Sequence, residues 1–195
     1  MGVKKIVLAS QSPRRKQLLE WAEIAFDIIV RSTDESFPPD MDTALVPVHI
    51  ARGKALAVKD CEEYKRYNVD TTILAADTVV VLDNTIIGKP ADREDAVDIL
   101  SRLSGKKHLV ITGVVILTGN EEIAFADTTE VWFHPLTLEQ VTFYVDKYKP
   151  YDKAGAYAIQ EWIGVIGIKS VRGDFYNVMG LPVSRVVQAL EAVSL

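Results

Sequence analysis

The sequence predicts an α/β fold built on a mixed sheet. Apolar runs typical of strands alternate along the chain with amphipathic segments typical of helices. Two long apolar runs, 72–82 and 109–117, each lead into a two-residue turn and a returning strand, at Asp83-Asn84 and Gly119-Asn120. Hairpins beside connections through helices mean that the sheet is mixed rather than purely parallel.

The predicted elements alternate from the start of the chain. In the first half we expect strands at 4–10, 26–30 and 72–82, helices at 13–25 and 45–60, and a polar loop at 31–42. In the second half we expect a helix from Asp92 to Gly105, strands at 109–117 and 123–133, a helix opened by the capping box of Thr137 and Gln140, glycine-rich loops with short strands over 150–180, and a last helix from Pro182.

Composition limits the classes of function. The 195 residues are 48% hydrophobic, so we expect one globular domain over 1–195. The net charge of −5 argues against broad nucleic-acid or membrane binding, although a small anionic substrate remains allowed. The single cysteine, Cys61, fits a reducing compartment such as the cytoplasm. The run Ile6–Ala9 is too short for a signal peptide, and no stretch has the length of a membrane span.

The first predicted helix begins with an unusual concentration of positive charge. Ser12 is a good N-cap and Pro13 a good first residue, but Arg14, Arg15 and Lys16 follow where a helix dipole favours anions. A bound phosphate would explain the arrangement, and an exposed basic helix start is the alternative. The spacing predicts a buried face formed by Leu18, Trp21, Ala22 and Ala25.

Asp77 interrupts the apolar run at 72–82. A carboxylate there is costly to bury unless it is paired or binds a metal ion. Alternation could turn Asp77 toward solvent, but Ala75, Val79 and Val81 share its face. Asp77 is therefore a candidate metal ligand or general base.

Two lysines and an acidic loop accompany Asp77. Lys54 falls on the apolar stripe of its helix, where snorkelling to solvent is the alternative, and Gly53 beside it would allow close approach of another segment. Lys89 lies in a Gly-Lys-Pro turn, where an ordinary surface lysine explains it equally well, and Asp34-Glu35 could simply be solvated. Carboxylates with lysines and arginines, and no catalytic Cys or His, nevertheless suit metal-assisted phosphoryl transfer.

The histidines and the segment 152–160 complete the candidates. His49, His108 and His134 lie far apart without metal-ligand spacing, so we expect structural or surface roles. In 152–160, Gly155 indicates a closely packed turn, and the amide of Gln160 could read a base edge or cap a loop.

These residues resemble the Maf family, the septum-formation inhibitor-like nucleotide pyrophosphatases, from end to end. The motifs occur in the family's order: ASQSPRR at 9–15, AADTVV at 75–80, GKP at 88–90, LSG at 103–105, TGV at 112–114, DKAGAYAIQ at 152–160 and GLP at 180–182. The resemblance implies an elongated mixed sheet with flanking helices and a cleft between two lobes, similar to the inosine triphosphate pyrophosphatases. It also implies cleavage of nucleoside triphosphates to monophosphate and pyrophosphate with a divalent metal, Mg²⁺ or Mn²⁺.

Site roles follow from the resemblance, residue by residue. Asp77 is implied as the catalytic acid/base, and Glu35 with Asp77 as the metal ligands. Lys54 and Lys89 match the two functional lysines, and Ser10 and Arg15 fall in the phosphate-binding SxSxxR stretch.

The resemblance also points to a branch of the family. Arg14, Thr78 and Gln160 stand at three selectivity positions, as in the branch that prefers dTTP and UTP. The branch acting on 7-methyl-GTP typically has Trp, Gln and Glu there. The chain departs from the common pattern at Ala158 and at Glu161-Trp162, where many members have glycine, and Trp162 could reshape the base pocket.

The expected function is thus a house-cleaning pyrophosphatase for dTTP, UTP and modified pyrimidine nucleotides, with a family-level link to cell division arrest. One alternative is a non-catalytic nucleotide-binding regulator of septum formation. Another keeps the chemistry and changes the base to 7-methyl-GTP or an inosine-type nucleotide. Family analogy implies a homodimer.

Overall fold

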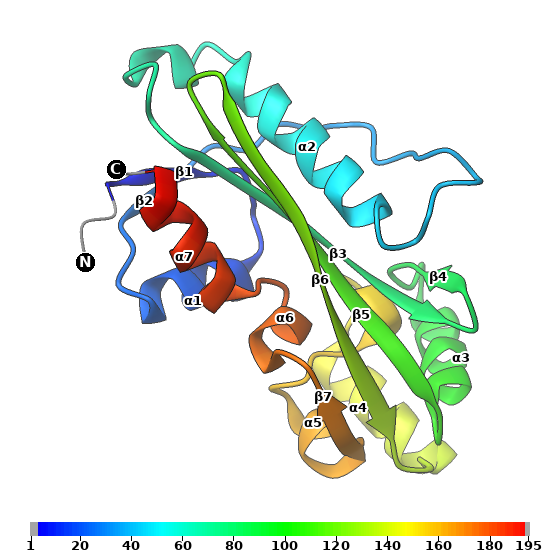
Figure 1. Ribbon diagram of the computed structural model, residues 1–195. Coiled ribbons are helices and arrows are strands. Elements are labelled where there is room, and N and C mark those ends of the chain that lie inside the picture. Colours follow the sequence, from blue (N-terminus) through cyan, green and yellow to red (C-terminus); the bar gives the residue numbers. More distant parts are fainter. Residues whose placement is uncertain (1–3, 194–195) are drawn as a thin grey trace. The chain divides into compact units, whose positions relative to one another are not determined.

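The computed structural model describes residues 4–193 and contains the predicted mixed sheet (Figure 1). The strand order is β2-β1-β3-β5-β6-β7, with β4 paired to β3. β1 is parallel to β2 and β3, whereas β4 is antiparallel to β3 and β7 to β6. The strands are β1 (Ile6–Leu8), β2 (Phe26–Ile28), β3 (Ile73–Leu82), β4 (Thr85–Ile87), β5 (Lys107–Thr118), β6 (Glu121–Phe133) and β7 (Ile168–Arg172).

Helices connect these strands, which confirms the α/β class. They are α1 (Pro13–Trp21), α2 (Val46–Lys59), α3 (Arg93–Leu103), α4 (Leu138–Tyr148), α5 (Trp162–Gly167), α6 (Phe175–Met179) and α7 (Val183–Val193). None of the helices within residues 4–193 combines the length and the apolarity needed to span a membrane.

The chain divides into two compact units. The first runs to Asp77 and adds Thr112–Asp127 and the chain from Gly180 on, and the second consists of Thr78–Ile111 and Thr128–Met179. The long strands β3, β5 and β6 contribute residues to both units. The family resemblance implied two lobes, and the structure has two compact units.

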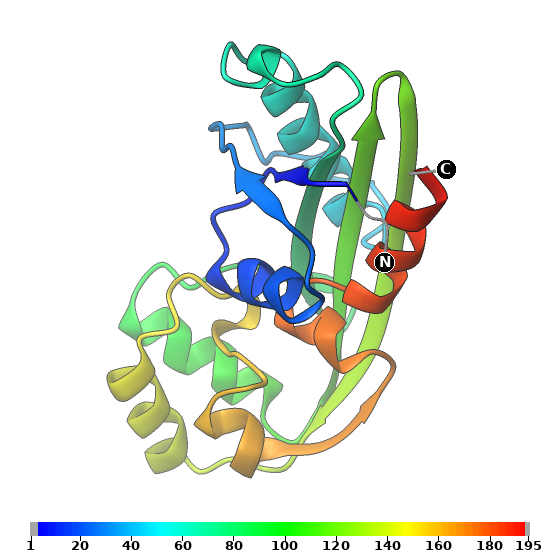
Figure 2. The same cartoon turned by 90° about the vertical axis from the view of Figure 1, so that its left-hand side faces the viewer.

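In the first unit, strand alternation sorts the core onto two faces of the sheet. Figures 1 and 2 show α2 on one face and α1 with α7 on the other. One hydrophobic cluster joins the inner face of α2 to alternate residues of β3, including Ile73 and Ala75. Asp77 has the same parity as Ile73 and Ala75, so the strand directs its carboxylate to the α2 face.

The start of α1 agrees with its sequence signals, but its predicted buried face does not. Ser12 accepts a hydrogen bond from the Arg15 N–H and Pro13 is the first helical residue. Leu18 is buried, whereas Trp21 is 59% exposed and Ala25 is also exposed, so the face predicted through Trp21 and Ala25 was wrong. The helix ends at Trp21, because Glu23 turns into the left-handed region (φ 56°), and the expected spacing cannot continue.

In the second unit, α3 and α4 pack against each other, and the N-terminal caps predicted for both helices are confirmed. Asp92 caps α3, and the capping box of Thr137 and Gln140 opens α4. Over 150–180 the prediction of loops and short strands was incomplete, since α5 and α6 also lie there. These helices have six and five residues, too few for a helical periodicity to register in the sequence.

Close approach between α2 and the sheet occurs at Gly113 of β5 and not at Gly53, where the missing side chain would have allowed another segment to approach. A Cβ on Gly113 would lie 2.2 Å from the Val48 nitrogen and 2.3 Å from the Pro47 carbonyl carbon. A Cβ on Gly53 would meet nothing within 4 Å. Gly113 therefore sets how closely α2, and with it Lys54, packs on the first unit's sheet.

We predict that Gly113→Ala lowers the free energy of unfolding by about 3 kcal/mol or more, because backbone atoms of α2 cannot yield as a flexible side chain would. Gly53→Ala is the matched control and should raise it by about 0.5–1 kcal/mol, since alanine has the higher helix propensity and its Cβ would meet nothing within 4 Å. Urea unfolding measures both. Equal stability of the two variants would contradict this account of α2 packing.

Candidate active site

Lys54 joins the two carboxylates that the sequence singled out. Its Nζ lies 2.6 Å from Asp77 Oδ1 and 2.8 Å from Glu35 Oε1. Asp77 comes from β3, Lys54 from α2 and Glu35 from the loop between β2 and α2. Three segments of the first unit thus meet at one ammonium group.

Burial decides between the two interpretations of Lys54. Only 18% of the Lys54 side chain and 15% of the Asp77 side chain are exposed, against 48% for Glu35. A snorkelling lysine would carry its ammonium to water, whereas this one ends between two carboxylates. The ion pair also accounts for a carboxylate in an apolar strand, because burying an unpaired one would be costly.

Arg15 supplies a second buried cation in the first unit. Its guanidinium donates from Nε to the Gly180 carbonyl oxygen (2.8 Å) and from Nη1 to Ser10 Oγ (3.1 Å). Burial lowers the pKa of Arg15 below its usual value, while the charges of Asp77 and Glu35 oppose that shift. Ser10 is buried as well, and its Oγ also accepts the Ser12 N–H (3.2 Å).

Five of the predicted residues thus form two groups of contacts in the first unit. Lys54 contacts Glu35 and Asp77, and Arg15 contacts Ser10. Arg14, half-buried in the first turn of α1, belongs to the same unit. Two cations and a helix start suit phosphate oxygens, and the carboxylates supply a base.

The donor set fits a hard divalent cation. The Glu35 and Asp77 oxygens both contact one ammonium, so they lie close enough together to face a common positive charge. No group of three or more His, Cys, Asp or Glu side chains in the described chain could hold a metal ion. A metal here would need ligands beyond these two, as Mg²⁺ usually takes from water and phosphate.

Thr78, Lys89 and Gln160 belong to the second unit. Lys89 is exposed, in the turn after β4, and that turn is tied to the segment 152–160 because the Gly155 N–H donates to the Gly88 carbonyl oxygen (3.1 Å). Gly155 has φ 68°, and a Cβ there would press against Val80 at 2.9 Å. The closely packed turn expected at Gly155 is confirmed.

The same unit contains polar residues that the sequence analysis missed. Lys153 is 8% exposed, and its ammonium lies 2.8 Å from Asp152 Oδ1 and 3.7 Å from Glu161 Oε1. Glu161 also accepts a hydrogen bond from the Tyr144 hydroxyl. Lys153 stands next to Asp152 in an otherwise apolar segment, but only the fold brings Glu161 to Lys153 and Tyr144 of α4 to Glu161.

His108 is buried, in agreement with a structural role. Its Nε2 lies 2.7 Å from the Tyr157 hydroxyl, and both rings pack on Phe133, with ring centroids 5.2 Å and 5.0 Å away. Burial lowers the pKa of His108 to about 4 and raises that of Tyr157. Both groups are therefore neutral near pH 7.

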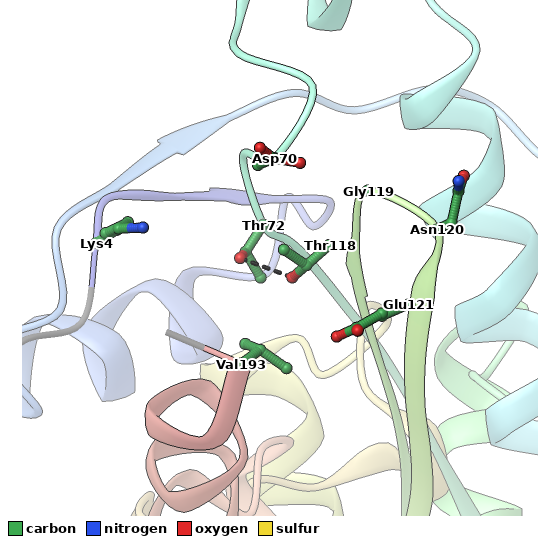
Figure 3. A pocket seen from close by; sticks show the side chains of 8 residues that line it. All are labelled: Lys4, Asp70, Thr72, Thr118, Gly119, Asn120, Glu121 and Val193. Atoms are coloured by element: carbon green, nitrogen blue, oxygen red, sulfur yellow. Dashed lines mark hydrogen bonds between the residues drawn. The ribbon is translucent and has the colours of Figure 1, made fainter. Parts of the chain in front are cut away.

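A polar cavity of about 450 Å³ lies elsewhere in the first unit (Figure 3). The Thr72 and Thr118 hydroxyls in its wall lie 2.9 Å apart and bond to each other. None of the predicted site residues lines it; the lining residues are Lys4, Asp70, Thr72, Thr118, Gly119, Asn120, Glu121 and Val193.

Comparison with known proteins shows similarity along almost the whole chain. A family model described as "Maf-like protein" matches residues 5–193. A dTTP/UTP pyrophosphatase of Cytophaga hutchinsonii is 48% identical over 186 residues, 95% of this chain and 83% of the relative. Proteins of the same name are 47% identical in Parabacteroides distasonis, over 96% of this chain and 95% of the relative, and 49% identical in Porphyromonas gingivalis, over 92% and 89%.

We predict that His108 makes the protein less stable in acid. The pKa of His108 is about 4 in the folded chain and near the ordinary 6.5 in the unfolded chain. Between these two pH values the unfolded chain therefore binds a proton that the folded chain does not bind. His108 therefore contributes full stability above pH 6.5, and about 3 kcal/mol is lost as the pH falls to 4. Urea unfolding between pH 7 and 4 measures this loss.

His108→Gln should flatten that pH dependence, whereas His134→Gln, which removes an exposed histidine, should keep it. An unchanged slope in His108→Gln would contradict the assignment.

Proposed function

Because the chain belongs to the Maf family, we propose that it hydrolyses nucleoside triphosphates, dTTP and UTP foremost, to the monophosphate and pyrophosphate. The family predicted from the sequence motifs is confirmed by the match over residues 5–193. The observation that carries the proposal is the contact of Lys54 with both Glu35 and Asp77, in the unit that also holds the buried Arg15. The names of relatives 47–49% identical support the substrate class.

We propose that a divalent metal, Mg²⁺ or Mn²⁺, is held by Glu35 and Asp77 together with phosphate oxygens. The carboxylates are the hard oxygen donors that such ions take. When bound, the metal would supply positive charge that offsets the charge on the pyrophosphate leaving group.

Asp77 is the proposed general base. It accepts a proton from a water molecule whose oxygen attacks the α-phosphorus, while the bond from that phosphorus to the bridging oxygen of the leaving pyrophosphate breaks. Lys54 holds Oδ1, so Oδ2 is the oxygen proposed to receive the proton. Hydrogen bonding from Lys54 also fixes the carboxylate's orientation, which matters because the base must reach the water along one direction.

The proposed role of the cations is to stabilise charge that grows on the leaving pyrophosphate. Arg15, Lys54 and Lys89 are the cations proposed for this role, Lys89 on the resemblance alone. Ser10 accepts a 3.1 Å hydrogen bond from the Arg15 guanidinium and so orients it before the substrate binds. A preoriented guanidinium stabilises charge on the phosphate without having to rearrange.

Base selection is proposed for Arg14, Thr78 and Gln160, following the resemblance. Gln160 is exposed, and its amide both donates and accepts, as reading the edge of thymine or uracil requires. The proposal further includes a single functional domain, a homodimer and action on nucleotides in the cytoplasm.

Pyrophosphate release from the purified protein tests the proposal. The panel holds canonical, 7-methylated and inosine triphosphates, each with Mg²⁺, with Mn²⁺ and with a chelator. Metal-dependent turnover centred on dTTP and UTP is the expected result. Turnover of 7-methyl-GTP or inosine triphosphate alone would overturn the pyrimidine assignment, and nucleotide binding without turnover would point to the non-catalytic regulator.

We predict that Asp77→Asn lowers kcat for dTTP by about 10²–10⁴-fold, because an amide cannot take the proton of the attacking water. Asp70→Asn removes an exposed carboxylate just before the same strand and should keep full turnover. Steady-state kinetics measures kcat, and thermal unfolding checks that both variants fold. Normal turnover by Asp77→Asn would contradict the mechanism.

We predict that Gln160→Ala flattens base preference and largely keeps kcat. A site that hydrogen-bonds a substrate group discriminates against substrates lacking it, so the preference for dTTP over CTP should fall about tenfold or more. The ratio of kcat/KM values for the two nucleotides measures it. Gln188→Ala, at an exposed glutamine of α7, is the control, and an equal ratio in the two variants would refute the role of Gln160.

A further inference from the structure

We propose that the Tyr144 hydroxyl and the Lys153 ammonium clamp the turn that presents Gln160, and that they thereby set base selectivity. We refer to Tyr144, Lys153 and Glu161 as the turn clamp. The inference rests on the proposed function, in which Gln160 reads the base. Every contact in it lies within the second unit.

Gln160 stands at the tip of a β-turn. The Glu161 N–H donates to the Ala158 carbonyl oxygen (3.1 Å), which closes a four-residue turn with Ile159 and Gln160 at its centre. Ile159 is 5% exposed and anchors the turn in the core, while Gln160 is exposed. The turn therefore directs one apolar side chain inward and one amide outward.

One buried hydroxyl contacts both ends of this turn. Tyr144 of α4 has no exposed surface, and its oxygen accepts the Ala158 N–H (3.2 Å) and donates to the Glu161 carboxylate. Ala158 and Glu161 are the first and fourth residues of the turn. Removing the hydroxyl would deprive both the Ala158 N–H and the Glu161 carboxylate of their hydrogen bond to Tyr144.

Lys153 holds the other oxygen of the same carboxylate. Its Nζ lies 3.7 Å from Glu161 Oε1, while Tyr144 contacts Oε2. The Lys153 side chain is 10% exposed and that of Glu161 is 24% exposed, so solvent weakens this pair less than it would a surface pair. Both carboxylate oxygens of Glu161 thus contact groups that are themselves buried.

These contacts make the clamp a positioning device. Tyr144 has no exposed surface, so its hydroxyl acts on a nucleotide only through the turn. An amide distinguishes bases by which of its ends donates and which accepts, so its orientation must be fixed. A loosened turn lets Gln160 adopt other orientations, while Asp77 and its chemistry remain as they were. Base selectivity and KM should change, and kcat for dTTP should not.

The first test compares Tyr144→Phe with Tyr148→Phe. Tyr148 lies on the same helix with its ring stacked on that of Tyr144 (5.0 Å between centroids), so each variant removes one hydroxyl from the same pair of rings. We expect Tyr144→Phe to lower the dTTP/CTP ratio of kcat/KM about tenfold, the factor that one net hydrogen bond supplies, with kcat for dTTP within about twofold of wild type. Tyr148→Phe should keep the ratio.

A second variant covers the case in which Tyr144→Phe does not fold. Glu161→Gln keeps an oxygen that can accept from Tyr144 but removes the charge that faces Lys153, and it should lower the ratio less than Tyr144→Phe does. Asp146→Asn, which removes a carboxylate of α4 that pairs with Arg93, is its control and should keep the ratio. Thermal unfolding of all four variants separates loss of stability from loss of selectivity.

The double variant Tyr144→Phe/Gln160→Ala decides whether the clamp acts through Gln160. If it does, the double variant has the same ratio as Gln160→Ala alone. A lowered ratio in Gln160→Ala with an unchanged ratio in Tyr144→Phe and Glu161→Gln would overturn the clamp and leave the proposed function standing. An unchanged ratio in Gln160→Ala would overturn both the clamp and the proposed role of Gln160.

Discussion

The contact of one ammonium group with two carboxylates determines how the first unit is arranged around Asp77. Lys54 reaches Asp77 and Glu35 only because α2 lies close to the sheet, and Gly113 permits that approach by presenting no Cβ to Pro47 and Val48. Strand alternation directs Asp77 to the same face. A carboxylate that would be costly to bury in β3 is thereby paired, and it is held at a defined orientation that a general base needs.

The residues proposed for hydrolysis and those proposed for base reading fall mostly in different units. The first unit contains most of the residues proposed for hydrolysis, namely Asp77, Glu35, Lys54 and Arg15. The second unit contains Thr78, Gln160 and the turn clamp. The exceptions are Arg14, proposed for base reading but in the first unit, and Lys89, proposed for hydrolysis but in the second. Lys54, Glu35 and Asp77 contact one another inside the first unit, and the turn that carries Gln160 is held by contacts inside the second. Substitutions in the first group are thus expected to act on turnover, and those around Gln160 on the choice of nucleotide.

Sequence reasoning found the features that depend on neighbouring residues and missed those that depend on the fold. The hairpin turn at Asp83-Asn84 has φ of 50° and 62°, as its residue types predict. Asp77 was conspicuous because its strand neighbours are apolar. Ala25 was misplaced because the helix ends at Trp21 and Glu23 turns into the left-handed region before Ala25 is reached. Lys153 was missed because Glu161 becomes its neighbour only after folding. The ion pairs of Lys54 were equally hidden, since Glu35 and Asp77 lie 19 and 23 residues away in the chain.

The central claim is that water, activated by Asp77, attacks the α-phosphorus. Hydrolysis of dTTP in water enriched in oxygen-18, followed by mass spectrometry of the products, tests this most directly. The account predicts one labelled oxygen in the monophosphate and none in the pyrophosphate. Label in the pyrophosphate, or release of labelled orthophosphate in its place, would mean attack at another phosphorus and would contradict the mechanism.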